Sequence, residues 1–116
     1  MSQCIFCRIV QGEIPAKKVY EDDDILAFND IQPQRPVHVL VIPKKHITSL
    51  AEASPEDVPV LGKMLAKANE IAVAQGSPNG FRTIINTGEI GHQEVAHLHM
   101  HIVGGPEPVG PMLKRQ

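Results

Sequence analysis

Three histidines occupy alternate positions in one short stretch, at His97, His99 and His101. Side chains alternate between the two faces of a β-strand, so a strand over these residues would place the three imidazoles on one face. The residues that would then point into a core are Leu98, Met100 and Ile102. Imidazole changes charge near neutral pH, and three in this register favour a site that acts on one small ligand. The alternative is the solvated polar face of a half-buried strand.

The two cysteines, Cys4 and Cys7, are the second group that could do chemistry. Their C-x-x-C spacing supplies half of a tetrahedral zinc site, which needs two further ligands. The alternative is a pair of small buried residues on a helix. Thioredoxin-type redox chemistry is not favoured, because no strand-helix-strand pattern surrounds the pair. Two cysteines are also too few to staple a secreted scaffold.

The size and charge of the chain limit its other functions. The chain has 116 residues, 42% of them hydrophobic, and a net charge of -2, so residues 1–116 are expected to form one domain around a single core. A surface without basic runs has little electrostatic attraction to a nucleic acid backbone. No apolar stretch reaches the roughly 20 residues that span a bilayer, and the first residues do not resemble a signal peptide. We therefore expect a cytoplasmic protein that binds neither nucleic acid nor membrane.

Hydrophobic periodicity predicts the elements that must position these groups. A short helix is expected over residues 4–11, and a long amphipathic helix is expected to begin near Ser54 and to end before Gly76. Alternating and β-branched runs predict strands over residues 18–21, 25–28, 38–42, 81–86 and 97–103. The predicted fold is α+β, an antiparallel sheet with one long and one short helix.

The pattern His-h-His-h-His-h-h, where h is a hydrophobic residue, is met in full by residues 97–103. Further segments that match the same family are residues 13–17, 27–31, 41–46 and the pair Gly104-Gly105. On these motifs the chain resembles the histidine triad (HIT) family over nearly its whole length. Within that family it resembles the branch of histidine triad nucleotide-binding proteins, which are small purine nucleotide phosphoramidases. The resemblance implies a HIT-like fold and a homodimer with the long helix and a strand at its interface.

The resemblance also implies a reaction centred on His99. His99 would attack the α-phosphorus of a purine nucleoside 5′-phosphoramidate, and water would then hydrolyse the nucleotidyl-histidine. A neutral imidazole is a competent nucleophile, since its reference pKa is about 6.5. His97 and His101 would contact phosphate and handle protons, or mainly hold His99 in its tautomer. No cofactor is required for this chemistry.

Substrate contacts are carried over from the resemblance residue by residue. Asp30 would accept hydrogen bonds from the ribose hydroxyls. The phosphate would be contacted by Asn86, Gln93 and the backbone near Glu94. The residues that match the family's base pocket are Phe6, Ile14, Phe28 and Ile31. For any one of these apolar residues an ordinary core position is the alternative.

Some bacterial members of the family complete a zinc site with histidines that match His46 and His97, which would make a structural zinc bound by Cys4, Cys7, His46 and His97. Two residues depart from the family pattern. His92 stands in place of glycine, and Glu94 stands in place of a serine that meets phosphate. We expect the Glu94 side chain to turn away from the anion, because a carboxylate would repel it.

Three other functions compete with the phosphoramidase. The first is a nucleotide-binding interaction module in which hydrolysis is incidental. The second is a diadenosine polyphosphate hydrolase, whose branch also keeps all three histidines. The third is a metal-dependent hydrolase that uses the three histidines as ligands.

Overall fold

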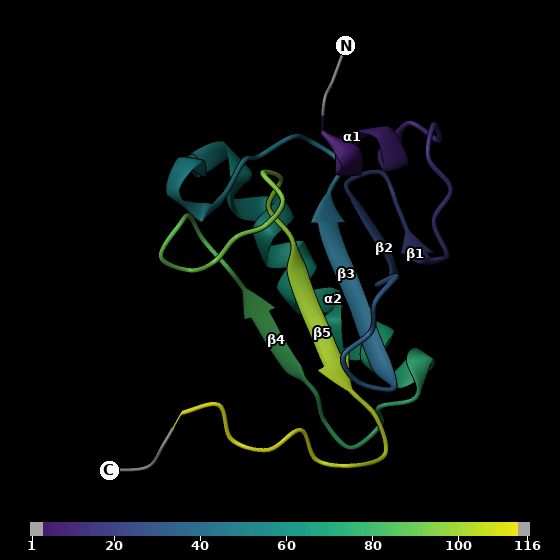
Figure 1. The fold of residues 1–116 in the computed structure, drawn as a ribbon. Helices are drawn as coiled ribbons and strands as arrows, with labels where there is room; N and C mark the ends of the chain where they lie inside the picture. The colour runs from purple at the N-terminus through teal and green to yellow at the C-terminus, as the bar shows by residue number, and fades with distance from the viewer. Residues whose placement is uncertain (1–3, 114–116) are drawn as a thin grey trace.

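The structure is a computed structural model that describes residues 4–113. Five strands form one antiparallel sheet with the spatial order β1-β2-β3-β5-β4 (Figure 1). The strands are β1 (Lys18–Glu21), β2 (Ile25–Asn29), β3 (Val37–Pro43), β4 (Arg82–Ile85) and β5 (Met100–Gly104). The predicted α+β fold with an antiparallel sheet is therefore confirmed, and β5 lies in its interior.

One short and one long helix accompany the sheet: α1 (Ile5–Val10) and α2 (Val58–Gln75). Two 3-10 turns, Leu50–Glu52 and Pro55–Asp57, precede α2. The second of these turns begins with a capping box, in which the backbone N–H of Ser54 donates to Asp57 Oδ2 at 2.9 Å. Gly76 ends the helix with a left-handed φ of 110°, which glycine adopts without steric cost. No helix within residues 4–113 is long and apolar enough to cross a membrane.

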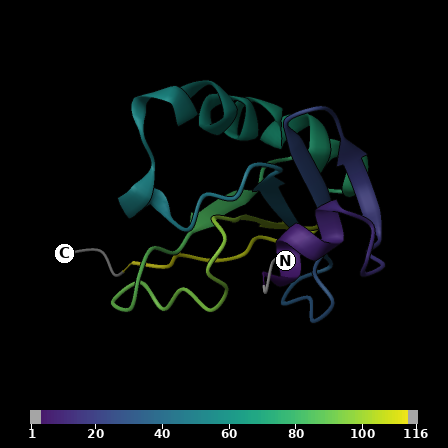
Figure 2. The same cartoon turned by 90° about the horizontal axis from the view of Figure 1, so that it is seen from above.

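The helices lie on opposite faces of the sheet (Figure 2). One apolar cluster joins α2 to the inner strands through Met64, Ala68, Ile71, Val39, Val41, Met100 and Ile102. The other cluster joins α1 to the opposite face through Phe6, Ile9, Leu26, Phe28, Leu40 and Ile42. His101 pairs with Leu40 across β5 and β3, and paired residues share a face. The side chain of His101 is therefore on the face that α1 covers.

The histidine strand begins later than predicted. We expected a strand over residues 97–103, but the ladder of β5 starts at Met100. Before Met100 the chain leaves the sheet, and the N–H of Leu98 donates to the carbonyl of Ile47 at 2.7 Å. The predicted alternation nevertheless holds, because Leu98, Met100 and Ile102 all lie in the core that α2 covers.

Candidate active site

His99 is held by the backbone of the residue two positions earlier. Its Nδ1 lies 2.8 Å from the carbonyl oxygen of His97 and donates to it. A neutral imidazole has one N–H, so this bond places the lone pair on Nε2. The side chain is buried and its ring lies 5.2 Å from that of His101, centroid to centroid. Nε2 is thus the nitrogen of His99 that can act as a nucleophile.

A second chain of hydrogen bonds sets the tautomer of His101. The backbone N–H of Gln34 donates to Nδ1 of His38 at 2.9 Å, so the proton of neutral His38 is on Nε2. That nitrogen lies 2.9 Å from Nδ1 of His101 and 3.4 Å from a carboxylate oxygen of Asp30. Since His38 donates to Nδ1 of His101, neutral His101 holds its own proton on Nε2. The network therefore leaves the N–H of Nε2 of His101 directed away from His38, where it can donate a hydrogen bond to a ligand.

Burial keeps this histidine network neutral. It lowers the pKa of His38, and the carboxylate of Asp30 only partly opposes the shift. It also lowers the pKa of His101, with further lowering by His99 and His38 and opposition from Asp30 and Glu94. Both rings are therefore neutral at physiological pH.

The residues predicted to hold the nucleoside surround one hollow. A cavity of about 400 Å³ is lined by Phe6, Ile14, Phe28, Asp30 and Ile31, together with other residues of α1, β2 and the segment between them. The ring of Phe6 is edge-on to His99, at a centroid distance of 5.2 Å. Phe6 also meets Phe28 edge-on at 5.6 Å. The hollow thus adjoins the predicted nucleophile through Phe6.

Asn86 lies on the other side of the histidines. It lines a hollow of about 520 Å³ together with His38, His101, Arg82 and residues of the carboxyl-terminal segment. The structure therefore places Asn86 beside His101 and away from the nucleoside hollow.

Gln93 shapes the loop that precedes the triad. Its Oε1 accepts from the N–H of Gly88 at 2.9 Å, and its Nε2 donates to the carbonyls of Thr48 and Val95 at 2.8 and 2.9 Å. Both amide hydrogens are thus committed to the protein. In this structure Gln93 holds the loop, and its contact with phosphate stays a prediction.

The two departures from the family pattern lie together on the same loop. His92 has a left-handed φ of 60°, the conformation that the usual glycine adopts most easily. Glu94 is exposed, and its carboxylate lies 3.3 Å from Nε2 of His92. It is nevertheless near enough to act electrostatically on His101.

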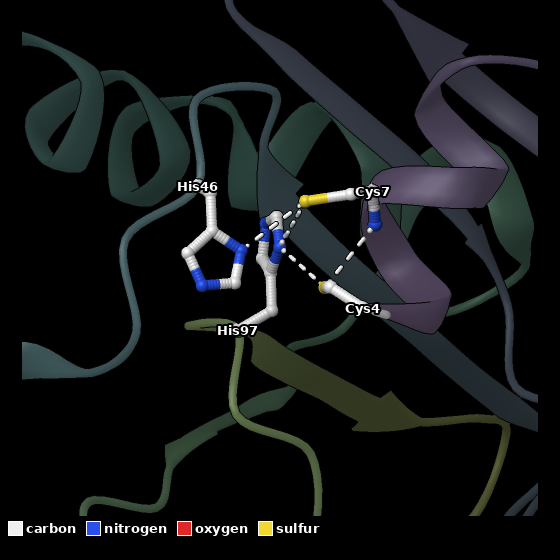
Figure 3. Close-up of side chains that lie close together, drawn as sticks. All are labelled: Cys4, Cys7, His46 and His97. Atoms are coloured by element: carbon white, nitrogen blue, oxygen red, sulfur yellow. Dashed lines mark hydrogen bonds between the residues drawn. The ribbon is translucent and has the colours of Figure 1, made fainter. Parts of the chain in front are cut away.

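Four potential metal ligands converge beside the triad (Figure 3). Cys4 caps α1 and Cys7 lies in its first turn, and both sulfurs face the two histidines. Cys4 Sγ lies 3.2 Å from Nδ1 of His97, and Cys7 Sγ lies 3.1 Å from Nδ1 of His46 and 3.5 Å from Nδ1 of His97. All four ligand atoms lie within 4.8 Å of one another. The structure therefore brings together the whole ligand set predicted for zinc.

The geometry and the outer contacts of this group fit zinc. Zinc bonds of about 2.3 Å to sulfur and about 2.0 Å to nitrogen put S and N about 3.5 Å apart in a tetrahedron, close to the observed separations. Nε2 of buried His97 donates to the carbonyl of Pro43 at 2.9 Å, and Nε2 of His46 lies 3.4 Å from Thr48 Oγ1. Such bonds leave Nδ1 free to bind a metal, and ligating histidines usually make them.

The second cluster of this kind, Asp30, His38 and His101, does not fit a metal. Nδ1 of His38 accepts a hydrogen bond from Gln34, so Nε2 must carry the proton and has no lone pair for an ion. The three triad histidines also do not form a converging group among the described residues. The geometry therefore gives no support to a hydrolase that uses His97, His99 and His101 as metal ligands.

Sequence reasoning missed the groups that fix the ring orientations. Pro43 and Gln34 act through backbone atoms, and Thr48 acts through its hydroxyl. Backbone contacts leave no signal in residue types. Thr48 carries a weak signal, because it stands two positions after His46.

Comparison with known proteins agrees with this geometry. A family described as "Scavenger mRNA decapping enzyme C-term binding" matches residues 3–114. Protein HitA of Neisseria gonorrhoeae is 57% identical over 106 residues, which cover 91% of this chain and 99% of that protein. An uncharacterized HIT-like protein of Synechocystis is 54% identical over 101 residues, covering 87% of this chain and 89% of that protein.

Solved structures give the same result. A HIT family hydrolase from Legionella pneumophila is 46% identical with a TM-score of 0.86, covering 90% of this chain and 95% of that one. A histidine triad protein from Clostridium difficile is 45% identical with a TM-score of 0.87, covering 96% of this chain and 99% of that one. Identity at this level over nearly the whole chain shows that this chain belongs to the histidine triad family.

Proposed function

We propose that the protein hydrolyses purine nucleoside 5′-phosphoramidates through a nucleotide bound covalently to His99. The observation that carries the proposal is the bond from Nδ1 of His99 to the carbonyl of His97, which turns the lone pair of Nε2 outward from the backbone. The solved HIT family hydrolase from Legionella pneumophila supports a hydrolytic function.

The reaction would proceed in two displacements. When the anionic phosphate binds beside it, His101 takes up a proton from solvent and becomes an imidazolium. Nε2 of His99 attacks the α-phosphorus, the P–N bond breaks, and the departing amine takes the proton from Nε2 of His101, which returns to the neutral ring. Water then attacks the phosphorus of the nucleotidyl-histidine, and His101 accepts a proton from it as the P–N bond to His99 breaks. The products are an amine, a nucleoside monophosphate and the regenerated histidine pair. A positioned acid of this kind contributes about 10² to 10⁴-fold to the rate.

Substrate binding would divide between the two hollows. We assign the base to the apolar hollow at Phe6 and Phe28, and the ribose hydroxyls to the carboxylate of Asp30, whose Oδ1 also accepts from the N–H of Gln32 at 2.8 Å. The leaving group would extend along Asn86 and His101.

We infer a structural zinc at Cys4, Cys7, His46 and His97, separate from the reacting atoms. When bound, zinc would stabilise the fold as a closed four-ligand site. His97 would then support His99 through its carbonyl instead of handling protons. The need for reduced thiolates agrees with the proposed cytoplasmic location.

A homodimer is part of the proposal. The helix α2 exposes apolar side chains at Val58, Leu65 and Val73, and β4 is an edge strand of the sheet. An exposed apolar face and an open strand edge are features that a subunit interface would cover. The mass of the protein measured in solution should then be twice that of one chain, and the mass of a single chain would refute the homodimer.

Rapid quench after mixing with adenosine 5′-phosphoramidate tests the function. We expect labelled nucleotide on His99, and loss of both adduct and turnover in His99→Ala. Tight binding of AMP without turnover would instead identify an interaction module. A higher kcat/KM for diadenosine tetraphosphate would identify the polyphosphate hydrolase.

A further inference from the structure

The helix α1 contributes to two sites at once. Cys4 and Cys7 on this segment belong to the group of metal ligands. Phe6 and Ile9 are the buried residues of the same helix, and they line the nucleoside hollow together with Ile5. Any displacement of α1 therefore changes the metal centre and the hollow together.

Besides apolar packing, contacts of its two cysteines hold α1 against the rest of the domain. Hydrogen bonds from Cys4 and Cys7 to His46 and His97 join residues 4–13 to distant parts of the chain. Other bonds of this segment close within it, such as Glu13 N–H to the carbonyl of Arg8 at 2.9 Å. A short helix has little stability of its own in water.

One of the metal ligands, His97, also contacts the predicted nucleophile His99. His97 offers Nδ1 to the metal group, while its carbonyl accepts from Nδ1 of His99. The ring of Phe6 touches both imidazoles edge-on, at centroid distances of 5.8 Å to His97 and 5.2 Å to His99. The wall of the hollow, the nucleophile and the metal ligands thus form one packed unit.

We propose that metal at Cys4, Cys7, His46 and His97 controls the affinity of the protein for nucleotide by fixing α1 against the sheet. This inference rests on the proposed function, because its two ligands are the zinc and the purine nucleotide proposed there. Without metal, α1 is held by the packing of Phe6 and Ile9 and by the cysteine–histidine hydrogen bonds, so it opens more often, and the opened form lacks this wall of the hollow. The effect is a coupling between two binding sites, so nucleotide must strengthen metal binding by the same factor.

The experiment compares the zinc-loaded chain with the same chain after a chelator has removed zinc. Titration calorimetry with AMP gives the nucleotide Kd of each form, and a competing zinc indicator gives zinc affinity with and without AMP. We expect AMP to bind about 5- to 150-fold more weakly without zinc, the usual range of such coupling. Zinc affinity should rise by the same factor when AMP is present.

Hydrogen exchange separates this proposal from general stabilisation. Removal of zinc should speed exchange in residues 5–13 and leave β3 and β5 protected. Two variants serve as matched controls. Cys7→Ser should behave like the chelated protein, whereas Arg8→Gln, which changes only an exposed pair with Glu13 on the same helix, should behave like the zinc-loaded chain.

Three outcomes would overturn the proposal: failure to bind zinc, equal Kd values for AMP with and without zinc, or loss of protection in β3 and β5 together with α1. Failure of the proposed function has a different signature. In that case the zinc-loaded chain would not bind AMP at all, or would bind it without forming an adduct on His99.

Discussion

One hydrogen bond joins the rings of His38 and His101: Nε2 of His38 lies 2.9 Å from Nδ1 of His101. The backbone N–H of Gln34 donates to the other nitrogen of His38, so His38 is the donor in this bond. The direction of this bond follows from the backbone, because Gln34 can only donate. His38 thereby acts on the reaction through His101 and is a positioning residue.

Replacement of His38 should therefore change proton handling more than binding. We expect His38→Ala to lower kcat by up to about 10²-fold, since misplacing a general acid loses part of the 10² to 10⁴-fold it supplies. The Kd for AMP should stay within about two-fold. His38→Asn, which keeps a short donor, should recover part of the rate. An equal loss in kcat and in AMP affinity would show that His38 only maintains the pocket.

The buried histidines should make stability depend on pH with a definite sign. Burial lowers the pKa of His38 and of His101 in the folded state below the ordinary histidine value of 6.5, while the unfolded chain binds protons near that value. The unfolded state then holds more protons below pH 6.5, so the stabilisation is complete above it and is lost as the pH falls toward the folded pKa values.

Urea unfolding between pH 8 and pH 5 measures this effect. The midpoint should stay level down to about pH 6.5 and then fall, and the fall should be smaller in His38→Gln. A midpoint that rises on acidification would contradict the neutral histidine network.

Removal of the Gln93 side chain should loosen the loop before the triad. Gln93→Ala deletes three hydrogen bonds, to Gly88, Thr48 and Val95, each with a net value of about 0.5–1.5 kcal/mol. We expect a loss of about 1.5–4.5 kcal/mol in unfolding free energy and a raised KM. Gln93→Glu would set a carboxylate oxygen against the carbonyls of Thr48 and Val95, so it should destabilise the protein at least as much as Gln93→Ala. Unchanged stability with a raised KM would instead support direct contact with phosphate.

A pair of glycine substitutions tests the packing behind β5. A Cβ on Gly104 would meet the Ser77 hydroxyl oxygen, which itself donates to the carbonyl of Gly80 at 2.6 Å. Gly104→Ala should therefore destabilise by about 1–3 kcal/mol. Gly62 lies inside α2 with nothing near its added Cβ, so Gly62→Ala should stabilise by about 0.5–1 kcal/mol. Thermal unfolding of both variants checks the two signs, and equal shifts would be inconsistent with the clash.

The sequence predicted those features that depend on local pattern. Strand alternation placed Leu98, Met100 and Ile102 in the core, and periodicity located both helices. The start of β5 was wrong because it depends on distant partners: its ladder with β3 and β4 ends at Met100, and Leu98 bonds to Ile47 instead. Residue types near His97 carry no record of that contact.

The candidate site was predicted as a set of residues, and its protonation pattern was not. The resemblance named Cys4, Cys7, His46 and His97 together, although Cys4 and His97 are 93 residues apart. The orientation of each ring follows from carbonyl and N–H groups of Pro43, His97 and Gln34. Such groups exist at almost every residue, so only their three-dimensional placement distinguishes them.

The position of β5 in the sheet also has a consequence for synthesis on the ribosome. The chain makes β5 last among the described strands, yet β5 separates β3 from β4. Until it emerges, β4 has no partner and the core under α2 lacks Met100 and Ile102. Pairings between residues far apart in sequence form slowly, so the nascent chain exposes two strand edges until β5 inserts. The strand that follows His99 and carries His101 is therefore also the one that completes folding.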